Sequence, residues 1–287
     1  MPANMRIAIA GTCGLALLIA QEINNSTSHQ LVILSRTTVD YNNAASLQHA
    51  LMGVDTVIST VLGTPQLRLI EAAVQCRVRR FAPAEFQGQP GLRSQNGLLD
   101  RGEDSALALL KHYSGYIQHT VFVCGILYER FSVNGMMSHR MGASTGYGNE
   151  GDFIANPRQM TSIAPIYDAA QNPSWLCLTS AYDVAQFVVR AIDMPTWASE
   201  MSMCGERMTV HSLVETIRAC RNRAWVSIEY QAPASTSLSY CIRLAPLLAT
   251  AEGRYDFVVP AYLNTVFPDI HVTRFQDWFL RNWASIP

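Results

Sequence analysis

The stretch from Met5 to Ile23 constrains the fold of this chain more than any other. Met5 to Ala10 is a short, mostly apolar and partly β-branched run, as expected of a buried parallel strand. The turn Gly11-Thr12-Cys13-Gly14 follows at once, and Leu15 to Ile23 continues as an apolar segment that is compatible with a helix. A strand, a glycine turn and a helix in this order are the context in which a nucleotide-binding fingerprint is meaningful.

Each part of this turn has a physical role in holding a pyrophosphate. Gly11 permits the tight turn, Gly14 lets the backbone approach the anion, and the helix that follows offers free N–H groups and the positive end of its dipole. Leu17 occupies the third glycine position of a G-x-x-G-x-x-G pattern, although the neighbouring Ala16 is small. The alternative is a glycine turn with a purely structural role. The predicted binding residues here are Gly11, Thr12, Cys13, Gly14 and Leu15.

The next two predicted strands extend the cofactor site. Leu31 to Ser35 is the second strand, and Arg36 follows it. In a dinucleotide fold the end of this strand meets the adenosine ribose, where an acid favours NAD and an arginine pairs with the 2′-phosphate of NADP. We therefore predict NADP(H) as the cofactor, with Ser35 and Arg36 at its site; the alternative for Arg36 is an ordinary exposed arginine. Val54 to Thr60 is a further strand, and its polar end adds Thr60 to the site.

The connection after the second strand is short. Val39 to Tyr41 looks like the stub of a third strand, and a helix is predicted from about Ala44 with Asn42 or Asn43 as its cap. Only residues 36–38 separate the second strand from this stub, whereas a parallel neighbour needs a crossover of about a dozen residues or more. We therefore predict a sheet truncated at the edge where the third strand would lie, which leaves the adenine side of the cofactor less covered.

Two side chains after later strands are candidates for proton transfer. Glu85 stands just past the predicted strand Val78–Ala82, and Tyr128 stands a few residues past the predicted strand Thr120–Cys124. Open α/β sheets place their ligands at these carboxyl ends. A carboxylate and a phenol that face one pocket can share proton transfer, with the pKa of the acid raised by apolar walls. The alternatives are that Glu85 caps its loop and that Tyr128 packs in the core.

Length and alternation of elements suggest how the chain is divided. With 287 residues, 49% of them hydrophobic and 15% charged, the chain is expected to be a soluble globular protein that buries one large core or one and a half domains. The regular β–α alternation ends near Phe131. We predict an α/β fold with a doubly wound parallel sheet, in which residues 1–131 form a Rossmann-like dinucleotide-binding core. Residues 132–287 are expected to form a loop-rich substrate lobe interleaved with the last strands and helices of the sheet.

Charge and residue spacing argue against several classes of partner. The formal charge of −1 gives no electrostatic reason for binding nucleic acid or an anionic membrane, and no apolar run is long enough to span one. The seven cysteines include no C-x-x-C pair, and the seven histidines show no zinc-binding spacing. We therefore expect a cytoplasmic protein with a small-molecule substrate, no nucleic-acid or membrane partner and no metal. Nothing in the sequence indicates an oligomeric state.

The chain resembles the NmrA-like and isoflavone-reductase-like branch of the atypical short-chain dehydrogenases, most closely its fungal members. The resemblance implies a Rossmann-like domain with a small C-terminal substrate lobe, NADP(H) as cofactor, and reduction of small, often aromatic or secondary-metabolite substrates. Some members of the family instead act as redox-sensing regulators without catalysis. The matching stretches span nearly the whole chain and are Ile9–Thr12 with Gly14, Ile33–Arg36, Val54–Thr60, Arg80–Phe86 and Ser180–Val184.

Departures from the family pattern keep three functions open. Ala84 stands where family members have serine, and the catalytic lysine would fall near Asp104, about a turn and a half before Lys111, the only lysine of the chain. We expect Lys111 to be structural or exposed. The first hypothesis is an NADPH-dependent reductase of a bulky apolar small molecule in fungal secondary metabolism. The others are a cofactor-independent isomerase or cyclase on the same scaffold, and an NADP(H)-sensing regulator.

Overall fold

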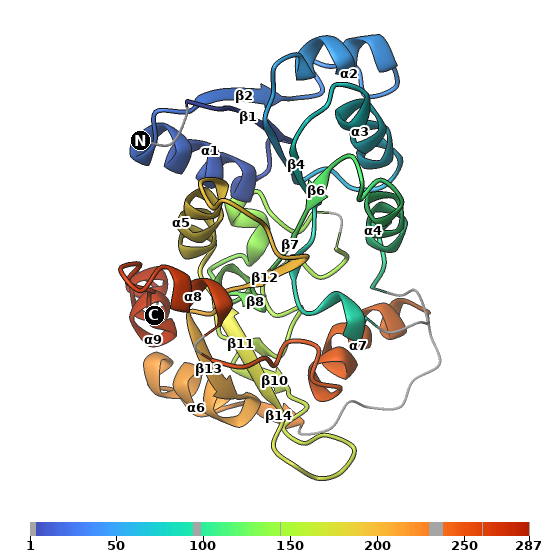
Figure 1. Cartoon of the computed structure of the whole chain (residues 1–287). Coiled ribbons are helices and arrows are strands. Elements are labelled where there is room, and N and C mark those ends of the chain that lie inside the picture. Colours follow the sequence, from blue (N-terminus) through green and yellow to red (C-terminus); the bar gives the residue numbers. More distant parts are fainter. Residues whose placement is uncertain (1–3, 94–98, 144, 230–237, 260, 287) are drawn as a thin grey trace. The chain divides into compact units, whose positions relative to one another are not determined.

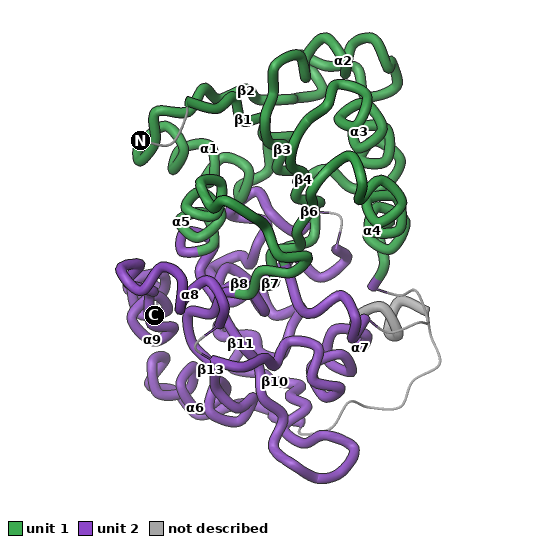
Figure 2. The backbone as a smooth tube through the Cα atoms, viewed as in Figure 1, with its two compact units in different colours: residues 1–86, 100–123, 184–202 green, residues 87–99, 124–183, 203–287 purple. Residues whose placement is uncertain are grey.

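The computed structural model describes residues 4–93, 99–143, 145–229, 238–259 and 261–286, and these residues form two compact units (Figure 2). The first unit contains the chain up to Phe86 together with Asp100–Val123 and Val184–Ser202. The second unit contains Gln87–Leu99, Cys124–Asp183 and the chain from Met203 onward. Each unit has its own hydrophobic core, so each is described by itself.

The first unit is built on a parallel sheet with the strand order β2-β1-β3-β4-β6 (Figure 1). Directly after β6, the chain continues as β7, which pairs in parallel with β12. The strands of this unit are β1 (Arg6–Ala10), β2 (Gln30–Leu34), β3 (Thr56–Ser59), β4 (Arg80–Ala82), β6 (Gln118–His119), β7 (Val121–Val123) and β12 (Glu200–Ser202), and β5 (Phe86–Gln87) also pairs with β7. This order confirms the predicted α/β fold of the Rossmann type.

Helices connect these strands, as a parallel sheet requires. They bury small and branched apolar side chains against the sheet; Ile19 and Ile70, for example, are fully buried. Asn43 caps the second helix, because its side-chain oxygen accepts a hydrogen bond from the Ser46 N–H at 3.2 Å. The helices are α1 (Gly14–Ser26), α2 (Ala44–Leu51), α3 (Thr64–Gln75), α4 (Glu103–His112) and α5 (Ala181–Ile192), the last of which starts in the residues of the second unit.

The connection from β2 to β3 contains a single helix, α2, and no strand is formed by residues 36–43. Val39 and Tyr41, which look like the stub of a strand in the sequence, are instead buried turn residues. The Tyr41 hydroxyl donates a hydrogen bond of 2.7 Å to the Leu34 carbonyl at the end of β2. In the described part of the chain β2 is therefore the edge of the sheet, as the truncation predicts.

The second unit contains two small sheets of three strands each, with the orders β14-β10-β9 and β13-β11-β8. In the second of these sheets, β11 pairs in parallel with β8 and antiparallel with β13. The strands are β8 (Ile126–Leu127), β9 (Ala155–Asn156), β10 (Thr161–Ile163), β11 (Trp175–Thr179), β13 (Glu206–Thr209) and β14 (Ser227–Glu229). Strands this short rely on side-chain packing for stability, because each supplies only a few ladder hydrogen bonds.

Aromatic packing supplies much of the core of the second unit. Phe275 packs against Tyr128 and Phe131 in edge-to-face arrangements, with ring centroids 5.2 and 5.5 Å apart, and Phe279 stacks on Trp283 at 5.6 Å. The helices of this unit are α6 (Val210–Arg221), α7 (Leu238–Ala251), α8 (Tyr262–Val266) and α9 (Phe275–Trp283), and the short 3-10 turns are η2 (Tyr128–Phe131) and η3 (Met136–His139), with η1 (Pro90–Leu92) in the preceding loop.

The division of the chain differs in detail from the expected boundary at residue 131. The chain from Gln87 to Leu99 lies in the second unit, and Val184–Ser202 returns to the first. Gln89 shows why the first of these segments belongs there, because its N–H donates to the Arg254 carbonyl at 3.0 Å and its side-chain amide donates to the Asp256 carbonyl at 2.8 Å. The expected interleaving of the two parts is thus more extensive in the structure.

Candidate functional site

The end of β1 forms a tight turn against the end of β3. Gly11 has a φ of +107°, and a Cβ atom at this position would lie 2.2 Å from the Thr60 hydroxyl oxygen. The Thr60 N–H and hydroxyl both donate to the Ala10 carbonyl, at 2.8 and 2.9 Å, and the Gly11 N–H donates to the Leu34 carbonyl at 3.0 Å. Only glycine fits this backbone conformation and this space without strain. Three neighbouring strands are therefore joined at the turn.

Helix α1 begins at this turn with an open amino end. Its first internal hydrogen bond runs from the Leu17 N–H to the Cys13 carbonyl at 3.0 Å, so the N–H groups of the first turn have no partner within the helix. Cys13, at the N-cap, makes no side-chain capping bond, and the first turn contains no acidic residue. An anion is thus favoured here by the free N–H groups and by the helix dipole.

The side chains around the predicted fingerprint fit this arrangement. Thr12 is exposed, Cys13 and Gly14 are half-buried, and Leu15 is buried, so that Leu15 offers its backbone to a ligand. Ala16 is buried at 1% exposure, whereas Leu17, at the third glycine position, is only half-buried. The substitution of glycine by leucine therefore does not disturb the packing of α1 on the sheet.

Arg36 lies in the exposed turn just after β2. Its guanidinium forms no hydrogen bond or ion pair within the described residues, and it acts on Tyr41 only through space. Burial raises the pKa of Tyr41 to about 12, against the opposing effect of the Arg36 charge. Ser35 shapes the turn, because its hydroxyl lies 2.7 Å from the Thr37 hydroxyl. Arg36 is therefore a cation available for a ligand at the carboxyl end of β2.

Glu85 lies three residues past the end of β4 and is buried, with 1% of its surface exposed. Its backbone N–H donates to the Pro83 carbonyl at 2.7 Å, and the Ala84 N–H before it donates to the side chain of the buried Gln66, also at 2.7 Å. Because β1, β3 and β4 are parallel, Glu85, Thr60 and the Gly11 turn follow carboxyl ends on one edge of the sheet. The structure thus places them at the edge where such sheets bind ligands.

Tyr128 lies in the core of the second unit with none of its surface exposed. Its hydroxyl donates a hydrogen bond of 2.9 Å to the Thr273 carbonyl, and its ring packs against Phe275 and Trp278. Burial raises the pKa of this phenol far above its usual range, and the nearby carboxylate of Glu206 adds to the effect. These contacts are the ones expected if Tyr128 packs in the core. A role for Tyr128 in proton transfer stays a prediction.

Two buried carboxylates beside Tyr128 were not singled out from the sequence. Both oxygens of Glu129 accept a hydrogen bond from the Ala181 N–H at the start of α5, each at 3.1 Å. Burial raises the pKa of Glu129 to about 7. Asp183 accepts hydrogen bonds from the Thr273 N–H and hydroxyl at 2.8 and 3.2 Å, and burial raises its pKa as well. The position of Glu129 directly after the predicted catalytic Tyr128 was the signal in the sequence that could have pointed to it.

Lys111 lies in the last turn of α4 with an exposed side chain. A cation at this position suits the negative end of the helix dipole. Within the described part of the chain, no three or more His, Cys, Asp or Glu side chains are placed to hold a metal ion. In that same part, every helix is too short or too polar to cross a membrane.

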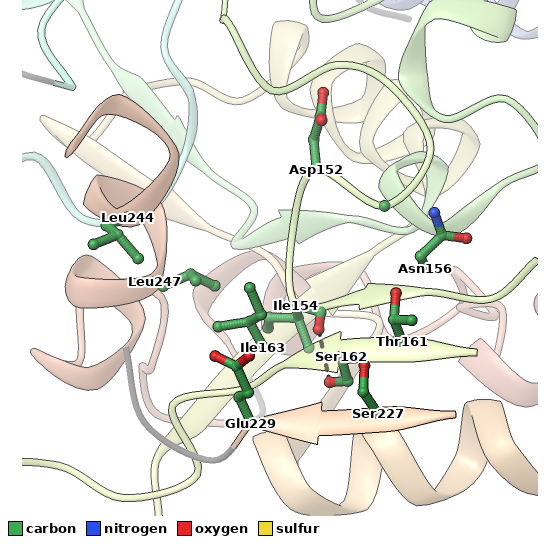
Figure 3. Close-up of a pocket in the computed structure, with 11 residues that line it drawn as sticks. Asp152, Ile154, Asn156, Thr161, Ser162, Ile163, Ser227, Glu229, Leu244 and Leu247 are labelled. Atoms are coloured by element: carbon green, nitrogen blue, oxygen red, sulfur yellow. Dashed lines mark hydrogen bonds between the residues drawn. The ribbon is translucent and has the colours of Figure 1, made fainter. Parts of the chain in front are cut away.

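Among the described residues of the second unit, two cavities bear on the site. One of 220 Å³ is bounded by the sheet β14-β10-β9 and by Leu244 and Leu247 of α7 (Figure 3). In Figure 3 the Ser162 hydroxyl, next to this cavity, donates to the Ile154 carbonyl at 2.8 Å. The other, of 550 Å³, is lined mainly by apolar side chains of the chain from Pro165 to Gln171 and of α7. None of the predicted site residues lines either cavity.

The parallel sheet with a glycine turn and an open helix end defines an α/β fold of the Rossmann type. No family model matches the chain. Its sequence is similar to that of the oxidoreductase BOA1 from Botryotinia fuckeliana (strain B05.10), with 22% identity over 315 residues that cover 96% of this chain and 98% of BOA1. This similarity extends over both units.

Solved structures share the fold. The leucoanthocyanidin reductase from Vitis vinifera, in a ternary complex, matches with a TM-score of 0.68 and 15% identity over 96% of this chain and 98% of the reductase. The triphenylmethane reductase from Citrobacter sp., in complex with NADP(H), matches with a TM-score of 0.65 and 14% identity over 97% of this chain and all of the other. Two reductases of different substrates therefore have the same architecture as this chain.

Proposed function

We propose that this chain is an NADP(H)-dependent reductase of a bulky apolar small molecule in fungal secondary metabolism. The observation that carries the proposal is the Gly11 turn, where the missing Cβ and the open end of α1 leave room and charge complementarity for a pyrophosphate. The oxidoreductase BOA1 supports the redox chemistry, and the names of the two reductases support aromatic, polycyclic substrates.

Within this proposal, the residues at the sheet edge contact different parts of the cofactor. The turn from Gly11 to Leu15 holds the pyrophosphate, Thr60 lies along the ribose, and Arg36 pairs with the 2′-phosphate after Ser35 has shaped the turn. NADPH, when bound, supplies the hydride. Because Arg36 is exposed and makes no ion pair within the described residues, its pairing with a phosphate replaces contacts with water alone.

Proton transfer is assigned to Glu85, with Tyr128 as the second predicted participant. Glu85 is buried just past the carboxyl end of β4, at the edge where open α/β sheets place their ligands. Replacement by glutamine keeps the shape and removes the proton. The assignment therefore predicts that Glu85→Gln lowers kcat by 100-fold or more with little change in NADPH affinity. A fall in NADPH affinity with kcat unchanged would make Glu85 a structural residue.

The decisive experiment is calorimetry with NADPH and NADH on the wild type, Arg36→Gln and the control Arg77→Gln. Arg77 is exposed and precedes β4, at the opposite end of a strand from Glu85. A charge-assisted contact to phosphate predicts that NADPH binds the wild type about 10 to 100 times more tightly than NADH. Arg36→Gln should abolish this preference and Arg77→Gln should keep it. An unchanged ratio in Arg36→Gln would remove Arg36 from the site.

A cofactor-independent isomerase or cyclase is the second candidate, favoured by two observations. The single-helix connection between β2 and β3 leaves β2 as the edge of the sheet in the described residues, and Lys111 is an exposed residue in the last turn of α4. No binding of NADPH at millimolar concentration, together with conversion of a substrate in cofactor-free buffer, would establish this candidate. Binding of NADPH without turnover of any substrate would favour the NADP(H)-sensing regulator.

A further inference from the structure

Arg254, just after α7 in the second unit, is the most unusual charged residue of the described chain. None of its surface is exposed. None of its three guanidinium nitrogens has a hydrogen-bond partner among the described residues. Its guanidinium carbon lies 5.7 Å from the centroid of the ring of the neighbouring Tyr255. A buried cation without hydrogen bonds is strongly unfavourable unless an anion or water satisfies it.

Arg80 in the first unit shows how this chain satisfies a buried guanidinium when the role is structural. It is equally buried, with no exposed surface. Its nitrogens donate to the side chain of Gln118 at 3.0 Å and to the carbonyls of Ile192, Met194 and Pro195 at 2.6 to 2.8 Å. Every donor group of Arg80 is thus directed at an oxygen of the protein, whereas those of Arg254 are not.

The carboxylates nearest to Arg254 in the sequence do not compensate its charge. Asp256 forms a two-point ion pair with Arg207, at 2.6 and 3.0 Å. Glu252 is exposed. The buried cation therefore has no internal counter-ion among these neighbours.

The backbone around Arg254 is nevertheless closely fitted. The Arg254 carbonyl accepts a hydrogen bond from the Gln89 N–H at 3.0 Å. A Cβ atom on Gly88 would lie 2.5 Å from this carbonyl oxygen and 2.9 Å from the Arg254 Cγ, so that only glycine fits here. The stem of the side chain is held in place, while the head is left without protein partners. A cation whose position is fixed in advance loses little entropy when it pairs with an anion.

We propose that Arg254 is the anchor of an anion site in the second unit and that its ligand is an organic carboxylate. A planar guanidinium whose donors have no hydrogen-bond partner among the described residues matches the two oxygens of a carboxylate. That this carboxylate belongs to the substrate of the reductase rests on the proposed function, whereas the anion site itself does not.

The test measures thermal unfolding of the full-length chain, without NADPH, in benzoate and in its neutral analogue benzamide. Benzoate should raise the Tm of the wild type by about 3 °C at a concentration ten times its Kd, and benzamide should leave it unchanged. Arg254→Met keeps most of the stem and removes the charge. It should show no response to benzoate, and its Tm without ligand should equal or exceed that of the wild type, because an uncompensated buried charge is gone.

Two further variants make the test specific. Arg254→Lys keeps the charge without the planar fork and should keep only a weakened response to benzoate. Arg218→Met removes an arginine of α6 that pairs with Glu215 at the surface, and it should keep the full response. If inorganic phosphate raised the Tm of the wild type and benzoate did not, the site would bind an inorganic oxyanion, and the assignment of an organic carboxylate would be wrong.

Other outcomes also overturn the proposal. The anion site is wrong if the wild type does not respond to benzoate, or if Arg254→Met responds as the wild type does. A Tm of Arg254→Met that falls by more than about 10 °C, with no effect of benzoate on the wild type, would make Arg254 a structural residue like Arg80. Titration of Arg254→Met with NADPH separates this proposal from the proposed function, because cofactor binding should be unchanged.

Discussion

Two fully buried arginines, one in each unit, differ in how their donor groups are satisfied. In the first unit, Arg80 lies in a strand of the sheet with its donors fixed on the Gln118 side chain and on three carbonyls, and its guanidinium also lies 5.1 Å from the Trp197 ring. In the second unit, Arg254 has the same degree of burial and no such bonds among the described residues. This difference between Arg80 and Arg254 is the basis of the anion site that we propose for Arg254.

The two units also differ in the polar groups that they offer to a ligand. The first unit satisfies the guanidinium of Arg80 internally and presents backbone N–H groups at the start of α1. The second unit holds carboxylates and a guanidinium inside a core of aromatic side chains. Charges in such surroundings interact strongly with any ligand that reaches them, because the local dielectric is low. Substrate recognition is therefore expected from the second unit and cofactor recognition from the first.

Arg80→Met should have the largest effect on stability. It leaves three carbonyls and an amide oxygen without their donors, and the loss of such a buried network typically amounts to about 3–5 kcal/mol. Chemical denaturation of this variant and of Arg254→Met measures the comparison directly. Equal free energies of unfolding for the two variants would break the distinction between the two arginines.

The buried carboxyl of Glu129 should make stability depend on pH. Its pKa is raised from 4.5 to about 7 in the folded chain, so the folded state binds a proton that the unfolded state has released between these values. This contribution is therefore fully present below pH 4.5 and is lost as the pH rises to 7, by on the order of 3 kcal/mol.

Glu129→Gln provides the measurement for this effect, because the amide oxygen can still accept the hydrogen bond from the Ala181 N–H. The free energy of unfolding of the wild type, relative to that of the variant, should fall as the pH rises from 4.5 to 7. Asp183, which raises the pKa of Glu129 through its charge, is kept in both proteins. A difference that does not vary with pH would show that Glu129 titrates as an ordinary exposed carboxyl does.

Gly11→Ala should affect the first unit in two ways. The added Cβ lies 2.2 Å from the Thr60 hydroxyl oxygen at a φ that suits only glycine, which should lower stability by about 1–3 kcal/mol. The loss in the free energy of NADPH binding should be larger than the loss in the free energy of unfolding, because the turn moves relative to the end of α1. Thermal unfolding and calorimetry on the same sample separate the two effects. Gly53→Ala is a matched control, with a positive φ and open space around it.

Lys111→Met should have the smallest effect. The side chain is exposed in the last turn of α4, where loss of a favourable dipole contact is worth about 0.5 kcal/mol. Turnover should be unchanged once a substrate is known. A thousandfold loss of turnover with an intact circular dichroism spectrum would return the only lysine of the chain to the catalytic site.

Much of the first unit could be predicted from the sequence because its signals are local. Glycines, strand patterns and the cap at Asn43 each act within a few residues. The truncation of the sheet was predicted from the small number of residues that follow β2 before the stub. Thr209 likewise caps α6 through the Ser212 N–H at 3.0 Å, as its position before a helix suggests. The strands β9, β10 and β13 were not anticipated, since two to four residues carry little periodicity.

The polar interior of the second unit could not be predicted, because it depends on distant pairings. Arg254 lies among Glu252, Gly253 and Asp256, a composition typical of a surface turn, and nothing local shows that its side chain is buried. Tyr128 was placed near a strand end, but its hydrogen-bond partner Thr273 is 145 residues away. Arg80 did carry a signal, since a charged residue in an apolar strand requires partners.

The short link between β2 and β3 also bears on how the chain folds. It brings Ile7 of β1 into register with Thr56 of β3, so the first two pairings of the sheet are completed within the first sixty residues. Closing a shorter loop loses less chain entropy, by about 0.6 kcal/mol for each halving of its length. Sequence-local contacts also form faster than remote ones. An amino-terminal nucleus around the Gly11 turn is thus expected to form early and to serve as the template onto which the remaining strands assemble.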